Sequence, residues 1–159
     1  MQTRREIFAL LSGCAAFTLF APRPAIAHHG FSGRYDDARP IYVEGIVRSA
    51  SFRRPHPLIE MQVDDDLRTP TELPQGEEFA DIVEVREEDR GRIIDVEYPP
   101  VRLFFGLEGR IATGDRIATI VFQNCRPPHQ LRGQWIRLPD GEAIVRRGRM
   151  QTEEAGCSS

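Results

Sequence analysis

The sequence predicts an all-β domain, folded as a small closed or partly open barrel or as a small sandwich. Apolar residues recur in short runs with the two-residue period of strands, turn residues separate these runs, and convincing helical spacing is nearly absent. Many short strands in one small chain can bury their apolar faces only against one another. A barrel or a sandwich provides that packing.

The first two strands are expected between residues 41 and 63. Apolar residues alternate with polar ones from Ile41 to Val47, and Gly45 inside this run predicts a bulge or a sharp bend. The run 58–63 alternates in the same way, and three aspartates end it. The segment 67–78 is rich in Pro, Thr, Glu and Gly and predicts a solvated loop.

The second half of the chain also contains short apolar runs separated by turn residues. Its apolar runs predict strands at 82–85, 93–96, 101–107 and 117–122. A final pair of runs, 134–138 and 143–145, flanks Pro139-Asp140-Gly141, which is a strong turn signal and predicts a hairpin.

Residues 1–27 have the composition of an export signal. Arg4-Arg5 resembles a twin-arginine signal, residues 7–21 are apolar, and Ala25-Ile26-Ala27 is a pattern after which signal peptidases cut. The apolar run is shorter than the roughly 20 residues that span a bilayer. We therefore expect a periplasmic or secreted mature protein without a transmembrane segment. The alternative is lipidation at Cys14, because Leu11-Ser12-Gly13-Cys14 resembles a lipoprotein box.

Residues 28–159 suffice for one domain with a modest core. We expect a barrel over 28–148, with a variable loop or insertion around 67–100, and a flexible tail over 149–159. The net charge of −3 becomes more negative once the arginine-rich leader is removed, which argues against a general nucleic-acid binder. The mature chain keeps Cys125 and Cys157, and in an oxidising compartment a disulfide between them is expected rather than a metal site.

Short motifs at both ends of the mature chain carry a family resemblance. They are Ala27-His28-His29-Gly30-Phe31, Tyr35-Asp36, Val43-Glu44-Gly45-Ile46-Val47, Gly114-Asp115-Arg116-Ile117 and Leu138-Pro139-Asp140-Gly141. Together they resemble the DUF6152 proteins, small exported bacterial proteins of unknown function. Arg54-Pro55-His56 departs from the Asn-Pro-His usual in that family. The resemblance implies export and a barrel like an OB-fold, and it implies no activity.

The four histidines carry most of the candidate chemistry. Cleavage after Ala27 makes His28 the first residue, so that its free amine and its imidazole can chelate one metal ion, which an internal histidine cannot do. His29 is the alternative terminal ligand and gives a weaker chelate. The plainer interpretation is that both histidines belong to a mobile polar terminus.

The other two histidines follow prolines, in Arg53-Arg54-Pro55-His56-Pro57 and in Arg126-Pro127-Pro128-His129. Proline fixes φ and removes a backbone donor, so both phrases are expected to be stiff, extended loops. Copper(II) favours tetragonal nitrogen ligands. His28 with either His56 or His129 therefore predicts a histidine brace. On this interpretation the protein is a copper carrier or delivery protein, whose partner is another exported protein or a metal donor or acceptor.

Other interpretations stay open. Arg53, Arg54 and Arg126 could bind an anionic small molecule or cell-envelope partner without any metal. His56 and His129 could be ordinary hydrogen-bonded residues, and Cys125 could bind a metal as a thiolate near His129. Catalytic motifs such as Gly-x-Ser-x-Gly and His-Glu-x-x-His are missing, so we expect a binding protein rather than an enzyme. A barrel that only docks on another exported protein is the remaining alternative.

Overall fold

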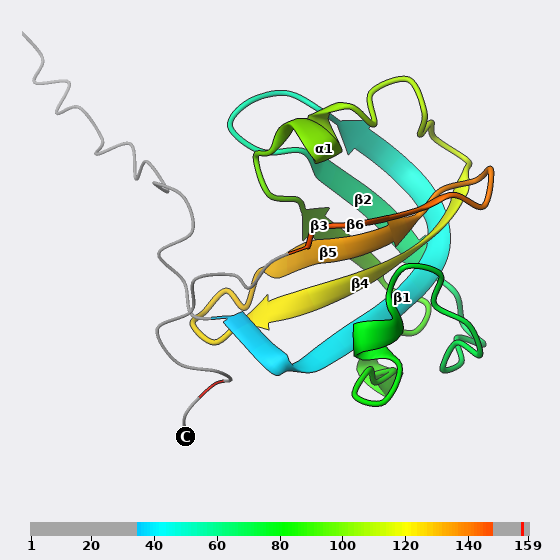
Figure 1. Cartoon of the computed structure of the whole chain (residues 1–159), viewed down its shortest axis with the longest axis vertical. Coiled ribbons are helices and arrows are strands. Elements are labelled where there is room, and N and C mark those ends of the chain that lie inside the picture. Colours follow the sequence, from blue (N-terminus) through cyan, green and yellow to red (C-terminus); the bar gives the residue numbers. More distant parts are fainter. Residues whose placement is uncertain (1–34, 148–156, 158–159) are drawn as a thin grey trace, which may run out of the picture. The chain divides into compact units, whose positions relative to one another are not determined.

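The computed structural model describes residues 35–147 and Cys157. The expectations for residues 1–27, His28, His29 and the rest of the tail lie outside these residues. The described strands are β1 (Tyr35–Ser51), β2 (Leu58–Val63), β3 (Ile93–Glu97), β4 (Arg116–Asn124), β5 (Leu131–Arg137) and β6 (Ala143–Val145). Three short helices join them: η1 (Glu77–Phe79), η2 (Glu87–Asp89) and α1 (Arg102–Phe105) (Figure 1).

Five strands close into a ring, which confirms the predicted small all-β barrel. The sheet has the order β3-β2-β1-β4-β5-β6, and an additional parallel pairing joins β3 to β5. This closure, which we call the β3–β5 seam, consists of the two pairs Val96↔Leu131 and Glu97↔Arg132. A five-stranded, partly open barrel of this kind with a helix between β3 and β4 is OB-like. Within the described residues, no helix is long and apolar enough to cross a membrane.

The long strand β1 belongs to both sides of the barrel. It pairs with β4 from Tyr35 to Ile46 and with β2 from Gly45 to Ser51, and Figure 1 shows it curving around the molecule. Gly45 lies where both pairings meet. A Cβ there would stand 1.9 Å from the Gln62 carbonyl oxygen, so only glycine allows the two backbones to approach this closely. The register shift lies nearby, between Val47 and Ser49, rather than at the glycine itself.

The barrel interior explains why the strand predicted at 101–107 is wrong. Pro99 and Pro100 end the β3 segment, and the amides of Phe104 and Phe105 then bond the Val101 carbonyl to form α1. Phe104 is fully buried, and its ring centroid lies 4.9 Å from that of Tyr98. So short an apolar run fits one turn of helix as well as a strand, and packing against Tyr98 decides between them.

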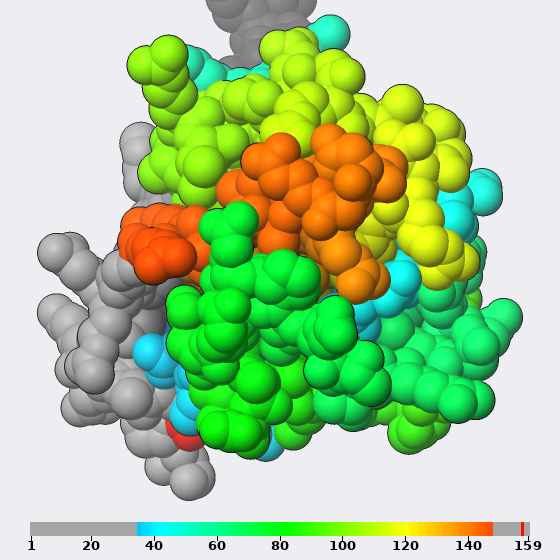
Figure 2. All heavy atoms as spheres, turned by 45° about the vertical axis from the view of Figure 1, so that its right-hand side comes forward, coloured from blue at the N-terminus to red at the C-terminus, as the bar shows by residue number. Residues whose placement is uncertain are grey.

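Residues 67–85 form a covering segment that we call the outer flap; its first part, 67–78, is the mostly exposed loop that was predicted, but apolar side chains anchor it to the barrel. Leu67, Leu73 and Phe79 are buried, and Phe79 packs edge-on against Phe122 of β4. The fully buried Trp135 donates from Nε1 to the Pro74 carbonyl oxygen at 2.8 Å. Figure 2 shows the flap, in green, seated against the orange β5–β6 hairpin.

The last residues of the flap, 82–85, form fewer β-sheet pairings than predicted. Instead of a strand at 82–85, a single bridge joins Glu84 to Ile41 of β1. The Tyr42 amide donates to the Glu84 carbonyl oxygen and the Glu84 amide donates to that of Pro40. The flap thus adds an apolar layer on the outer face of the barrel. Its Pro- and Glu-rich composition gives little sign of this layer, because the buried side chains of Leu67, Leu73 and Phe79 are widely spaced in the sequence.

We predict delayed ionisation of the tyrosines. Burial raises the pKa of Tyr35, Tyr42 and Tyr98, which are all the tyrosines of the chain. Above pH ~10 the unfolded chain has lost these phenolic protons while the folded protein keeps them, so stability falls as pH rises. Burial also lowers the pKa of Arg132 to about 10, and this shift makes stability rise with pH. It concerns one group, whereas the three tyrosines all lower stability as pH rises.

Tyrosinate absorbance, followed against pH with and without denaturant, checks this prediction. The unfolded chain should titrate near pH ~10. The native protein should show tyrosinate only at higher pH and together with loss of its near-ultraviolet circular dichroism. Three phenols that titrate independently near pH ~10 in folded protein would contradict the burial described above.

Candidate functional site

The two proline-histidine phrases occupy loops that both reach the end of β3. Residues 52–57 form the β1–β2 loop and residues 125–130 form the β4–β5 loop. Glu97, the last residue of β3, pairs with Leu58 at the start of β2 and with Arg132 near the start of β5. Both loops therefore lie on one side of the barrel, with the β3–β5 seam between them (Figure 1). In OB-like barrels these two loops border the usual ligand site.

The Glu97 carboxylate joins the two loops. Its Oε1 lies 3.0 Å from Nδ1 of His56, in the β1–β2 loop. The same oxygen accepts a hydrogen bond of 2.6 Å from Arg132, and Oε2 accepts one from the Gln130 side chain of the β4–β5 loop. The Arg132 side chain is 1% exposed and that of Glu97 is 15% exposed, so this ion pair is largely shielded from water.

Arg132 is the most deeply buried charge at this end of the barrel. Its guanidinium carbon lies 5.0 Å from the centroid of the Tyr35 ring, at the start of β1. Burial lowers the pKa of Arg132 to about 10, against the opposing effects of Tyr35 and Glu97. The guanidinium stays protonated at neutral pH, and Glu97 supplies a counter-charge.

The β4–β5 loop is a tight turn rather than the extended segment predicted. The Asn124 amide donates to the Gln130 carbonyl oxygen at 2.8 Å, and the His129 amide donates to that of Arg126 at 2.9 Å. His129 has a φ of 59°. The Asn124 side chain also accepts a bond of 2.9 Å from the Arg126 amide. Three hydrogen bonds, donated by the amides of Asn124, Arg126 and His129, close the loop around the prolines.

Both loop histidines hold Nδ1 against an oxygen acceptor. Nδ1 of His129 lies 3.0 Å from the Asn124 carbonyl oxygen, and Nδ1 of His56 lies against Glu97. A carbonyl or a carboxylate can only accept, so Nδ1 carries the proton and the lone pair of the neutral ring is on Nε2. Metal-binding histidines are commonly oriented in this way. His129 is exposed, whereas the His56 side chain is only 14% exposed.

The described residues do not by themselves form a metal centre. No group of three His, Cys, Asp or Glu side chains within 35–147 and Cys157 is arranged to hold a metal ion. Cys125 and Cys157 are joined in a disulfide with a Cα–Cα distance of 5.4 Å, so Cys125 is not a thiolate here. This bridge fixes residue 157 at the start of the β4–β5 loop. His28 and His29 lie outside the described residues.

The three arginines of the loops point into solvent. Arg53, Arg54 and Arg126 are exposed, and no carboxylate of the described residues pairs with them. Seven of the other thirteen arginines among the described residues form an ion pair with an acid: Arg39, Arg86, Arg90, Arg110, Arg116, Arg132 and Arg137. The loops therefore present unneutralised positive charge on an otherwise acidic chain.

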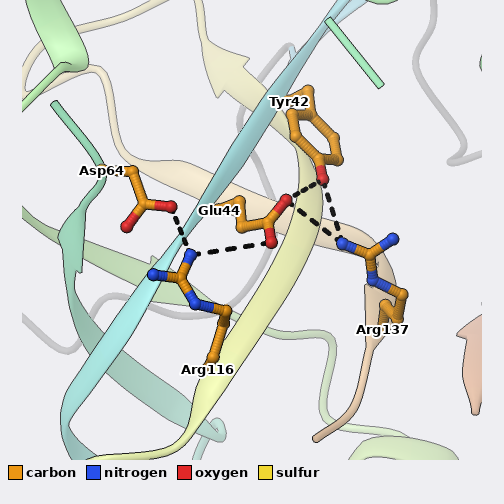
Figure 3. A network of polar contacts seen from close by, with 5 residues as sticks. All are labelled: Tyr42, Glu44, Asp64, Arg116 and Arg137. Atoms are coloured by element: carbon orange, nitrogen blue, oxygen red, sulfur yellow. Dashed lines mark hydrogen bonds and ion pairs between the residues drawn. The ribbon is translucent and has the colours of Figure 1, made fainter. Parts of the chain in front are cut away.

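Two other polar regions are internally satisfied. In Figure 3, Glu44 accepts bonds from the Tyr42 hydroxyl at 2.5 Å and from Arg137 at 3.1 Å, while Arg116 bridges Glu44 and Asp64. A cleft of about 350 Å³ lies beside the flap, where Arg86 pairs with Asp89 and Asp36 with Arg39. Neither contains a histidine or a cysteine, so the loop end of the barrel remains the candidate site.

Sequence reasoning missed the residues that unite the site. Glu97, Gln130 and Arg132 were absent from the predicted set, because nothing local distinguishes them from other charged strand residues. One signal was available: Arg132 lies in an apolar strand where a charge needs a counter-charge. Comparison with protein-family models, curated proteins and solved structures finds no match to this chain. The resemblance to the DUF6152 proteins therefore stays a prediction.

We predict that Glu97→Ala destabilises the protein by about 3 kcal/mol, because it removes the carboxylate from a buried guanidinium. Glu97→Gln should cost less, since its amide oxygen still accepts a hydrogen bond. Glu60→Ala is the matched control: Glu60 lies on the same face of the sheet opposite Asp95, so its loss should change stability by less than about 0.5 kcal/mol. Urea unfolding measures all three. Equal losses in the free energy of unfolding for Glu97→Ala and Glu60→Ala would contradict a stabilising role of the Glu97–Arg132 ion pair.

Proposed function

We propose that the processed protein binds copper with its terminal histidine and the β4–β5 loop, as an exported metal carrier or delivery protein. The proposed ligands are the free amine and imidazole of His28, with Nε2 of His129 as the third nitrogen. Such a T-shaped nitrogen set suits copper(II). The observation that carries the proposal is the contact between Nδ1 of His129 and the Asn124 carbonyl oxygen.

That contact brings His129 close to the start of β1. Asn124 is the direct register partner of Tyr35. His28 precedes Tyr35 by seven residues, a stretch that can span up to about 24 Å when extended. A chain of this length can return to the β4–β5 loop. The proposal depends on cleavage after Ala27, because only that cut frees the amine of His28.

His129 is a better candidate for the third nitrogen than His56. His129 is exposed in a turn whose backbone is closed by hydrogen bonds, which holds its ring without burying it. His56 is nearly buried, and its ring nitrogen contacts the carboxylate that also neutralises Arg132. We therefore assign His56 mainly a structural role at the β3–β5 seam rather than a role as a copper ligand. His29 stays the alternative terminal ligand. A carrier of this kind would exchange copper with another exported protein as donor or acceptor.

The test is a copper(II) titration of protein that begins at His28. We expect tight binding, with electron paramagnetic resonance showing nitrogen ligands. His129→Ala should weaken binding by more than about tenfold, since even residues that only orient a ligand contribute that much. His56→Ala is the matched control and should change copper affinity less than His129→Ala does.

An added N-terminal glycine provides the second control. It moves the free amine away from the His28 ring and should abolish tight binding while leaving the barrel folded. Intact mass of the exported protein fixes the true first residue. Copper affinity that is indifferent both to the extra glycine and to His129→Ala would overturn the proposal.

The exposed arginines support a second candidate function, the binding of a small anion without metal. Arg53 and Arg54 are adjacent and unneutralised by the described residues, and guanidinium groups suit forked contacts to carboxylate or phosphate. This function would use the β1–β2 loop, with Arg126 as a contribution from the other loop. It predicts binding that weakens with salt.

Citrate and inorganic phosphate are the probes, and calorimetry at low and moderate salt is the measurement. Arg53→Gln/Arg54→Gln should reduce affinity at least tenfold if the loop forms a site. Arg68→Gln/Arg92→Gln is the matched control, because it removes the same charge from exposed positions outside both loops. Equal effects of the two double variants would mean that only net charge matters, and this candidate would then be rejected.

A further inference from the structure

The disulfide lies beside the loop that carries His129. Cys125 directly follows Asn124, whose amide bonds the Gln130 carbonyl oxygen at 2.8 Å. Cys125 and His129 both lie within the short turn that this bond closes, each next to one of the two bonded residues.

Cys157 completes the cluster from a distant part of the sequence. Its sulfur is bonded to that of Cys125, with a sequence separation of 32 residues and a Cα–Cα distance of 5.4 Å. Cys157 is exposed and Cys125 is partly exposed, so a small thiol can reach the bridge. Opening the bridge would leave two sulfurs and one imidazole at the same loop.

We propose that the reduced protein contains a second metal site, made of the Cys125 and Cys157 thiolates and Nε2 of His129. A thiol reductant supplies two electrons and two protons, the disulfide becomes two cysteine thiols, and the reductant leaves as its own disulfide. A metal ion then displaces the two thiol protons. Two thiolates and an imidazole suit zinc or copper(I), with a fourth position open to solvent.

The turn determines which ring nitrogen of His129 is available to a metal. The Asn124 carbonyl oxygen holds Nδ1 of His129 at 3.0 Å, so Nε2 is the coordinating atom. The spacing Cys125-x-x-x-His129 places both ligands in one short loop, and in the disulfide form the Cα of Cys157 lies 5.4 Å from that of Cys125. The disulfide form lacks this site, since a bridged sulfur is not a thiolate.

This inference shares His129 with the proposed function but does not depend on His28. The two can therefore fail separately. A protein with an extra N-terminal glycine lacks the terminal chelate and keeps both cysteines and His129, so metal binding by that protein reports only on the thiolate site.

The experiment titrates cobalt(II) into this glycine-extended protein before and after reduction with a thiol. Cobalt(II) is the probe because its thiolate complexes have charge-transfer absorption and its tetrahedral complexes have intense visible bands. We expect both signals from the reduced protein, displaced by zinc, and neither from the oxidised protein. Near-ultraviolet circular dichroism of the buried Trp135 follows the fold throughout.

Single variants identify the ligands. Cys125→Ser and Cys157→Ser should each reduce the charge-transfer intensity and weaken cobalt binding at least tenfold, and His129→Asn should weaken it without removing the thiolate band. His56→Asn is the matched control and should have no such effect. Absence of the charge-transfer band in reduced, folded protein would overturn the proposal. So would loss of the fold on reduction, or a band that persists in Cys157→Ser.

Discussion

The ion pair between Glu97 and Arg132 spans the seam at which β3 and β5 close the barrel. Only two residue pairs join β3 to β5, and the second of them is this pair. The guanidinium is almost fully buried, so it requires a counter-charge, and the geometry of the seam supplies one from the opposite strand. The same carboxylate bonds His56 and Gln130, which come from the two loops on either side. The Glu97 carboxylate therefore contributes both to the closure of the barrel and to the placement of the two loops.

This coupling explains how two similar phrases of the sequence come to share one end of the molecule. Proline stiffens each loop, but stiffness alone does not decide where a loop lies. The β1–β2 loop is fixed by His56 against Glu97 and by the Tyr98 amide, which donates to the Pro57 carbonyl oxygen. The β4–β5 loop is fixed by its own hydrogen bonds and by Gln130. Of the ligands proposed above, the barrel positions the His129 ring, whose Nδ1 lies 3.0 Å from the Asn124 carbonyl oxygen.

The sequence was informative where alternation was regular and uninformative where contacts were distant. The run 58–63 and the hairpin at 134–145 follow from period-two alternation and a strong turn signal, and both are present. The run at 101–107 became a helix because two prolines precede it and Phe104 packs on Tyr98; the prolines are visible in the sequence, but the packing is not. The seam partners were missed for a similar reason, because Glu97 and Arg132 are 35 residues apart. The ligand role of the histidines stays a prediction, and the orientation of the His56 and His129 rings could be seen only in three dimensions.

The outer flap has a consequence for how this chain tolerates cutting and grafting. Its anchors, Leu67, Leu73 and Phe79, are separated by exposed residues such as Thr71 and Glu72. A protease nick at that point would leave apolar anchors on both sides of the break, so the two fragments would remain associated through the packed layer on β4 and β5. For the same reason a foreign peptide spliced between Thr71 and Glu72 would be displayed from the surface without disturbing the ring of strands.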